Sequence, residues 1–260
     1  MACAIFTLVG VLSPSVLTPR ADALMLRRGL GSLEEAANLY SRALEAEQDN
    51  LDLKLKLADA LNGVMRVKTN SNTIVIDRLL DTPANKKVWA ALGPRALELA
   101  TAVRDARPSD VRAAATYADA YMFACSAKGI IKQALAGAAT VFKANAERLV
   151  KLDAKYDSAV GDALLGCFYA IAPWPYGSLD KAASHLDAAA GIEPCARNLY
   201  YVGVVAFKRK EWAKAVDNLR KAQHARVSSP TQADFADFVR SESARALALA
   251  EAELRKCDAR

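Results

Sequence analysis

Residues Leu199–Ala222, LYYVGVVAFKRKEWAKAVDNLRKA, decide the fold of this chain. Small and large apolar residues recur there at steps of three and four, on both sides of the polar break Lys208–Glu211. Residues three or four apart share one face of a helix, so each half of the stretch predicts an amphipathic helix. The small residues Gly203, Ala206 and Ala215 fall where two helix axes must approach closely. The stretch therefore predicts a helical hairpin with a tight turn.

This spacing resembles the tetratricopeptide repeat, a helical hairpin of about 34 residues. The residues that match the repeat pattern position by position are Leu199, Val202, Gly203, Ala206, Ala215, Leu219 and Ala222. The pattern returns, in stronger and weaker units, over most of Ser32–Ala222, where the second helix of one weak unit covers about Ile130–Leu152. The resemblance implies an all-α, right-handed superhelix of antiparallel helical hairpins, with a C-terminal capping helix over Thr231–Arg255.

Composition favours a folded, helical protein. The chain has 260 residues, of which 53 % are hydrophobic and 25 % charged, and alternating Val/Ile/Thr runs are nearly absent. The net charge of +6 is spread along the sequence, whereas a nucleic-acid-binding surface usually shows a concentrated basic stripe. The 5 cysteines show no CxxC spacing and no neighbouring histidine cluster, which argues against a zinc or redox site.

The first residues are interpreted as a leader. The apolar run Ala4–Leu12, followed by Ala21-Asp22-Ala23, is similar to the end of an export signal cleaved before Leu24. No Lys or Arg precedes the run, so a plastid lumen signal that lacks its first half is one interpretation, and a packed or disordered leader is the other. A run of about nine residues is too short to span a bilayer, which takes about 20. A leader of this kind predicts that the protein resides in the chloroplast (thylakoid lumen) or another exported compartment. The cytoplasm is the alternative.

The predicted organisation is a leader over residues 1–23 and a repeat domain over residues 24–260. Residues 69–87, TNSNTIVIDRLLDTPANKK, interrupt the repeats as an insertion. Loops of that length are often functional or disordered. The apolar residues Ile74, Val75 and Ile76 predict that this insertion packs back on the body of the domain.

No pattern of catalytic residues is found. The histidines, His185 and His224, have no Cys or carboxylate four residues later that would complete a metal site. Gly29-Leu30-Gly31 lacks the preceding strand of a phosphate-binding loop. Neither a Gly-x-Ser-x-Gly turn nor a His-Glu-x-x-His pair occurs. The sequence therefore predicts a protein that is not an enzyme, with no metal and no cofactor.

In repeat superhelices of this kind the first helices of the hairpins line the concave wall. If the register carries over, the partner-binding residues of this wall are Asp59, Asn62, Arg112, Asp119, Met122, Phe123, Arg197, Tyr200, Phe207 and Lys208. The proline-stiffened loop Pro173–Tyr176 offers Trp174 and Tyr176 as a further contact, unless the Trp174 ring folds over the end of the hairpin. The mixed wall suits an extended peptide or a partner helix. Positions that bind chaperone tails in related domains, such as Leu55 and Leu164, lack the required cations and amides.

The sequence predicts two alternative functions, which belong to different classes. The first is a non-catalytic protein–protein interaction scaffold that binds a partner in the concave groove. The second comes from residues 164–194, LLGCFYAIAPWPYGSLDKAASHLDAAAGIEP, which look like the T component of TRAP transporters and, less closely, the regulators of microtubule dynamics. That resemblance implies an accessory protein that handles a small hydrophobic solute. An open groove favours the scaffold, and a closed apolar tunnel favours the solute.

Overall fold

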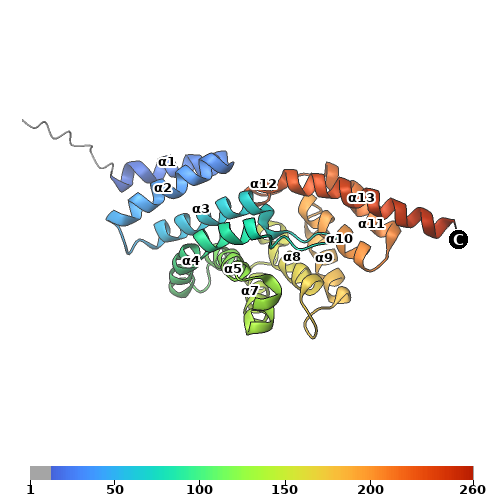
Figure 1. The fold of residues 1–260 in the computed structure, drawn as a ribbon. Coiled ribbons are helices and arrows are strands. Elements are labelled where there is room, and N and C mark those ends of the chain that lie inside the picture. Colours follow the sequence, from blue (N-terminus) through green and yellow to red (C-terminus); the bar gives the residue numbers. More distant parts are fainter. Residues whose placement is uncertain (1–12, 260) are drawn as a thin grey trace, which may run out of the picture.

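The computed structural model describes residues 13–259, which form a curved stack of helices without a strand (Figure 1). The apolar run Ala4–Leu12 lies outside the described residues. The helices are α1 (Pro14–Arg27), α2 (Leu30–Ala46), α3 (Leu51–Thr69), η1 (Asn70–Asn72), α4 (Pro83–Ala106), α5 (Val111–Ser126), α6 (Ile130–Gln133), η2 (Ala134–Ala138), α7 (Ala139–Leu152), α8 (Tyr156–Ile171), α9 (Leu179–Ile192), α10 (Ala196–Lys208), α11 (Trp212–His224), α12 (Pro230–Ala233) and α13 (Ala236–Asp258).

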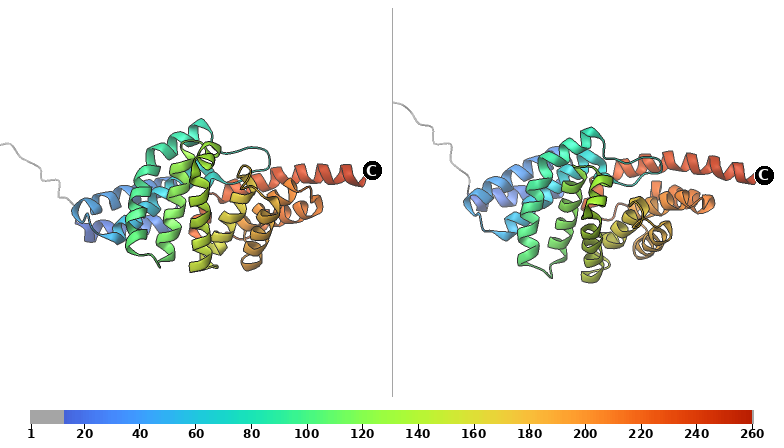
Figure 2. Two further views of the ribbon diagram at one scale, coloured as in Figure 1. Left: turned by 90° about the horizontal axis from the view of Figure 1, so that it is seen from below. Right: turned by 60° about the horizontal axis from the view of Figure 1, so that its bottom comes forward.

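Helices that follow one another along the chain pack in pairs: α1 on α2, α3 on α4, α5 on α7, α8 on α9 and α10 on α11. Each pair also contacts the next, so the pairs build one curved row, which is visible from two sides in Figure 2. The long helix α13 packs along α10 and α11 at the end of the row. The predicted all-α superhelix of helical hairpins with a closing helix is confirmed.

The hairpin over Leu199–Ala222 shows why small residues are needed. A Cβ atom on Gly203 of α10 would lie 2.6 Å from Cγ of Leu219 on α11, so only glycine allows this approach. Residues Ala196–Ala206 of α10 are buried on every side, whereas α11 buries a single stripe that includes Ala215 and Leu219. A helix with one apolar stripe faces solvent on its other side. Helix α10 is therefore an inner helix, and α11 covers it.

Local sequence sets several helix ends. The Asn50 side chain accepts hydrogen bonds from the backbone N–H groups of Asp52 and Leu53 at the start of α3. Asp110 does the same for Arg112 and Ala113 at the start of α5. These side chains satisfy donors that the first turn of a helix leaves without partners.

The insertion connects the two halves of the molecule. Its residues 73–82, called the strap from here on, leave η1 and reach the second half of the stack (Figure 2). Ile74 and Ile76 are buried in the apolar core that α8 to α13 form. The Tyr200 hydroxyl donates a hydrogen bond to the Ile74 carbonyl at 2.9 Å, and Lys208 Nζ donates to the Ile76 carbonyl at 3.0 Å. The prediction that the insertion packs back on the body is confirmed.

Two predicted helices are interrupted. The helix expected over about Ile130–Leu152 divides into α6, η2 and α7, where Gly137 takes a φ of +96° that helices of L-residues do not adopt. The closing helix expected over Thr231–Arg255 divides into α12 and α13 at Asp234. There the buried Asp234 carboxylate binds Arg28 and Arg66, and a tertiary contact outweighs local helix propensity.

Helix α1 runs across the boundary that we predicted between residues 23 and 24. Leu17 and Ala21 are 1 % and 0 % exposed and belong to the same core as α2. The proline at the first position of α1, Pro14, suits a helix start, because its missing N–H has no partner there anyway. Cleavage before Leu24 stays a prediction, but it would remove both buried side chains from the first hairpin.

A chain that begins at Leu24 is therefore expected to be less stable than a chain that begins at Ser13. The difference in the free energy of unfolding should be about 3 kcal/mol, because burial of one leucine side chain contributes roughly 1.5–3 kcal/mol. Urea unfolding of the two chains, followed by circular dichroism, measures it. Equal free energies would contradict a packed role for α1.

No helix within residues 13–259 combines the length and the hydropathy that crossing a membrane requires.

Candidate functional site

Two adjoining hollows lie on the inner side of the stack. A polar pocket of about 60 Å³ lies between α3, α5 and α8, beside α12. An apolar cavity of about 140 Å³ continues from it between α5, α7 and α8, with η1 and the strap at its side. The residues that line both are Arg66, Asp119, Asp157, Val160, Leu164 and Thr231. The inner helices α3, α5 and α8 thus present one continuous site with a charged end and an apolar end.

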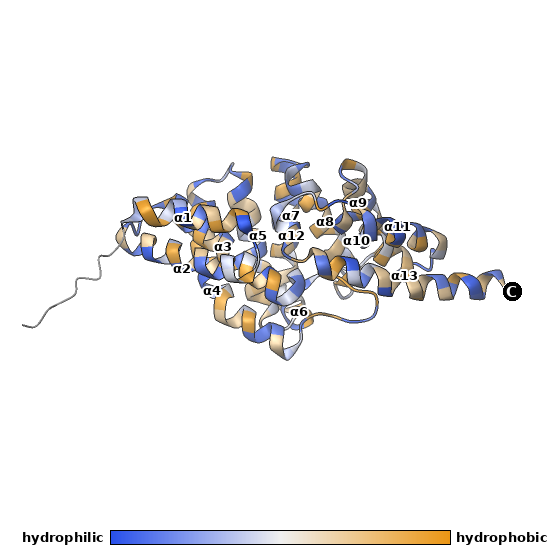
Figure 3. Cartoon of the chain, turned by 90° about the horizontal axis from the view of Figure 1, so that it is seen from above, coloured by the Kyte–Doolittle hydropathy of each residue, from blue (hydrophilic) through white to orange (hydrophobic). Residues whose placement is uncertain are grey.

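The apolar cavity has walls of aliphatic, aromatic and sulfur-containing side chains. Helix α5 contributes Met122 and Cys125, and α8 contributes Cys167 and Phe168. Burial raises the pKa of the Cys167 thiol to about 12 and also raises the pKa of Cys125. Both thiols are therefore uncharged at neutral pH, and this end of the site favours an apolar occupant. In Figure 3, apolar residues are visible on α8 beside α7.

Arg66 holds the charged end together. Its guanidinium, almost fully buried on α3, donates to Asp119 on α5 at 2.6 Å and to Asp234 at 2.9 Å. It also donates to Asp59 at 3.3 Å. Burial alone would lower the pKa of Arg66, but the carboxylates of Asp234, Asp119 and Asp59 raise it above its ordinary value. Arg66 therefore stays charged and ties α3 and α5 to the α12–α13 junction.

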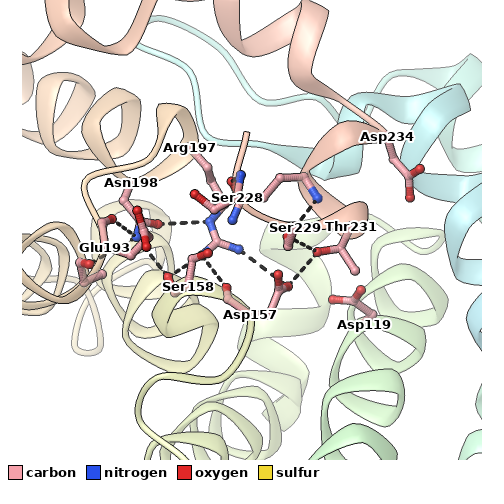
Figure 4. A network of polar contacts seen from close by, with 12 residues as sticks. Asp119, Asp157, Ser158, Glu193, Arg197, Asn198, Ser228, Ser229, Thr231 and Asp234 are labelled. Carbon is pink, nitrogen blue, oxygen red and sulfur yellow. Dashed lines mark hydrogen bonds and ion pairs between the residues drawn. The ribbon is translucent and has the colours of Figure 1, made fainter. Parts of the chain in front are cut away.

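A second network fixes the start of α8 (Figure 4). Arg197 of α10 donates to the backbone carbonyls of Asp157 and Ser158 at 2.9 and 2.7 Å. Asn198 donates to the carbonyls of Ser158, Ala189 and Glu193. Asp157 and Ser158 have φ values of +44° and +57°, a left-handed conformation that costs energy for residues other than glycine. Arg197 and Asn198 stabilise that backbone, and the Asp157 carboxylate in turn accepts a hydrogen bond from Thr231.

Four of the predicted partner-binding residues gather at this site. Asp59, Arg112 and Asp119 line the polar pocket, with side chains that are 21 %, 49 % and 23 % exposed. Met122 lines the apolar cavity and is half-buried. The sequence register therefore placed these residues of α3 and α5 on one wall.

Three other predicted residues are fully buried, and this part of the prediction is corrected. Asn62 donates to the Thr116 carbonyl, Phe123 stacks on Trp89, and Tyr200 binds the strap; each is 0 % exposed. A side chain without exposed surface cannot contact a partner in this structure. Asn62 faces α5, Phe123 faces α4 and Tyr200 faces the strap, and none of the three faces the open groove.

The hairpin of α10 and α11 is the other departure from the predicted wall. Arg197 is buried in the network at the start of α8, and Phe207 packs edge to face against Trp212. Lys208 is half-buried on the strap, and burial lowers its pKa. The strap covers this end of the wall, so the chain itself occupies the surface that the repeat pattern offered to a partner.

The loop between α8 and α9 stands out from the surface. Trp174 is 88 % exposed, so its ring does not fold over the end of the hairpin. Tyr176 is 37 % exposed, and its ring lies 6.3 Å from that of Phe168, measured between centroids. A contact between this loop and a partner stays a prediction.

Sequence reasoning missed Arg66 and Tyr156. Arg66 stands among Val64, Met65 and Val67, and a cation with apolar residues on both sides in a helix is a signal for a buried ion pair. Tyr156 lines the polar pocket, and burial raises its pKa to about 12. No spacing in the sequence pointed to it, because it begins a helix whose first turn is irregular.

No protein-family model and no curated protein matches the chain. Among solved structures, TTC0263, a thermophilic TPR protein of Thermus thermophilus, is similar with a TM-score of 0.61 and 16 % identity, over 90 % of this chain and 98 % of that one. The chain has a tetratricopeptide-repeat fold. The structure of a MamA RS-1 double mutant is also similar to this chain, with a TM-score of 0.50 and 15 % identity, over 81 % of this chain and 93 % of that one.

Proposed function

We propose that this protein is a non-catalytic scaffold that binds a protein partner, as an extended peptide or a helix, along the inner face of its tetratricopeptide-repeat fold. The observation that carries the proposal is the joined site itself. Partly exposed charges on α3 and α5 stand next to an apolar cavity on the same wall. Peptide recognition commonly combines an apolar anchor in a pocket with polar contacts around it.

Arg112 is the side chain best placed to meet a partner. Its Nη2 atom lies 3.7 Å from Asp59 Oδ2, which is beyond hydrogen-bonding distance. The guanidinium therefore keeps donors for a carboxylate or a backbone carbonyl of the partner. Arg66, by contrast, is buried and bound to three carboxylates. The partner should thus present an acceptor group close to its apolar anchor.

Arg112→Glu is expected to lower partner capture roughly tenfold, because a charge-assisted hydrogen bond is lost and a like-charge contact with a carboxylate is created. Arg95→Glu on α4 is a matched control, since the Arg95 side chain is 51 % exposed against 49 % for Arg112 and also has one carboxylate neighbour. The measurement is capture by the immobilised chain, quantified by mass spectrometry.

Both variants should have a free energy of unfolding close to that of the unaltered chain, because exposed ion pairs contribute about 0–1 kcal/mol. If both variants capture the same proteins in the same amounts, the polar pocket is not the binding site and the proposal fails.

A second candidate function is an accessory protein of the T-component type that binds a small hydrophobic solute. The observation that favours it is the apolar cavity, whose volume of about 140 Å³ is large for a hollow inside a helical stack. An uncharged probe such as toluene should then bind there. A cavity that takes up no apolar probe would remove this candidate and leave the scaffold proposal in place.

A further inference from the structure

We infer that the apolar cavity binds a small amphipathic molecule with a ring-sized apolar body and one neutral hydrogen-bond-donating head, which is held by the Asp119 carboxylate. The inference rests on the solute-binding candidate above and adds the chemical class of the solute.

The size of the cavity sets the apolar body. The cavity measures about 140 Å³, and its walls include Met122, Phe142 and Phe168. An apolar cavity of about 150 Å³ in a protein interior stays dry and binds benzene. A body of one six-membered ring therefore fits, and its binding would replace an empty hollow by packed contacts.

Asp119 supplies the acceptor at the charged end. It lines both the cavity and the polar pocket, and its side chain is 23 % exposed. Its Oδ2 atom accepts the hydrogen bond from Arg66, while within residues 13–259 no hydrogen bond is made to Oδ1. Burial raises the pKa of this carboxyl, against the effect of Arg66, so the folded chain has already removed part of its hydration. A hydroxyl at the end of the ring could donate a hydrogen bond to this open Oδ1 atom.

The charge balance of the site selects a neutral head. Asp119 is paired with Arg66, and the Asp157 Oδ2 atom lies 3.7 Å from Arg197 Nη1. The negative and positive charges that border the cavity therefore already compensate one another. A carboxylate head would meet Asp119 and Asp157. An ammonium head would bring an unmatched charge against the apolar wall. Burying either charge without a partner costs more free energy than burying a hydroxyl that has an acceptor.

Two cysteines of the chain report on occupancy. Cys125 and Cys167 line the cavity, whereas Cys195 is buried outside its lining. The full chain with Cys3→Ser and Cys257→Ser is treated with methyl methanethiosulfonate, and the labelling rate of each remaining cysteine is followed by peptide mass spectrometry. The probes are p-cresol, toluene, p-toluate and p-methylbenzylamine. Cys195 is the internal control, since a ligand in the cavity should not change its rate.

We expect p-cresol to slow the labelling of Cys125 and Cys167 with roughly tenfold higher affinity than toluene, because a hydrogen bond to a carboxylate contributes that much. Asp119→Leu should abolish the advantage of p-cresol over toluene. Val160→Phe, which fills the cavity, should abolish protection by both probes. Unfolding curves of each variant show that the stack is intact.

Equal protection by toluene and p-cresol, or stronger protection by p-toluate or p-methylbenzylamine, would overturn the neutral donor head and leave the solute-binding candidate standing. If none of the four probes changes the labelling of Cys125 and Cys167, the inference and the solute-binding candidate both fail.

Discussion

Replacing Arg66 by Met is expected to lower the free energy of unfolding by about 3–5 kcal/mol, the loss typical of removing one partner from a buried ion pair. The Arg66 side chain is 3 % exposed and binds Asp59, Asp119 and Asp234, which belong to α3, α5 and the α12–α13 junction. Without the guanidinium, Asp119 would be left as a half-buried carboxylate with no cation. Asp234, whose side chain is 0 % exposed, would keep only Arg28.

Urea unfolding followed by circular dichroism measures this change. Arg95→Met is the control, because the exposed Arg95–Glu98 pair is expected to contribute only about 0–1 kcal/mol. Arg66→Lys keeps the charge but cannot make the branched set of contacts, so its loss should be intermediate. A loss below that of the Arg95 control would show that the Arg66 network does not join the two halves of the stack.

Gly203→Ala is the substitution expected to show the close helix contact most directly. Alanine is favoured over glycine in a helix by about 1 kcal/mol, yet the variant should be less stable by about 1–3 kcal/mol, because overpacking outweighs that gain. The new Cβ atom would lie 2.6 Å from Leu219 Cγ and 3.3 Å from the Leu219 backbone nitrogen. Helix α10 would have to move away from α11.

Gly191 in α9 offers the matched control, since a Cβ atom there would meet no atom within 4 Å. Gly191→Ala should stabilise the chain by about 0.5–1 kcal/mol. The two melting temperatures should therefore shift in opposite directions. A stabilising Gly203→Ala would refute the close approach of α10 and α11.

The helices themselves could be predicted because their signals are local. The spacing of Gly203, Ala206 and Ala215 depends only on residues a few turns apart, and the structure has a helical hairpin there. The same periodicity placed Asp59, Arg112, Asp119 and Met122 on one wall. Helix α1 was missed, since Pro14 and Pro19 are typical of a linker and its buried face, Leu17 and Ala21, is short.

The accessible part of the site could not be predicted in the same way. Whether Tyr200 and Lys208 face a partner depends on where the insertion goes, and a strap that returns across the stack leaves no periodic signal. Sequence spacing also placed Asn62 and Phe123 on the inner side, but each is buried there against a neighbouring helix.

The sequence by itself determined most of the helices from α2 onward and the pairing of each with its neighbour, because both depend on residues that are a few turns apart. Only the tertiary structure decided which part of the inner wall stays open. That outcome rests on contacts between distant residues: Tyr200 binds Ile74 across 126 positions, and Arg66 binds Asp234 across 168. Such contacts form where burial of apolar surface and pairing of buried charges lower the free energy of the whole stack, and no short segment contains both partners.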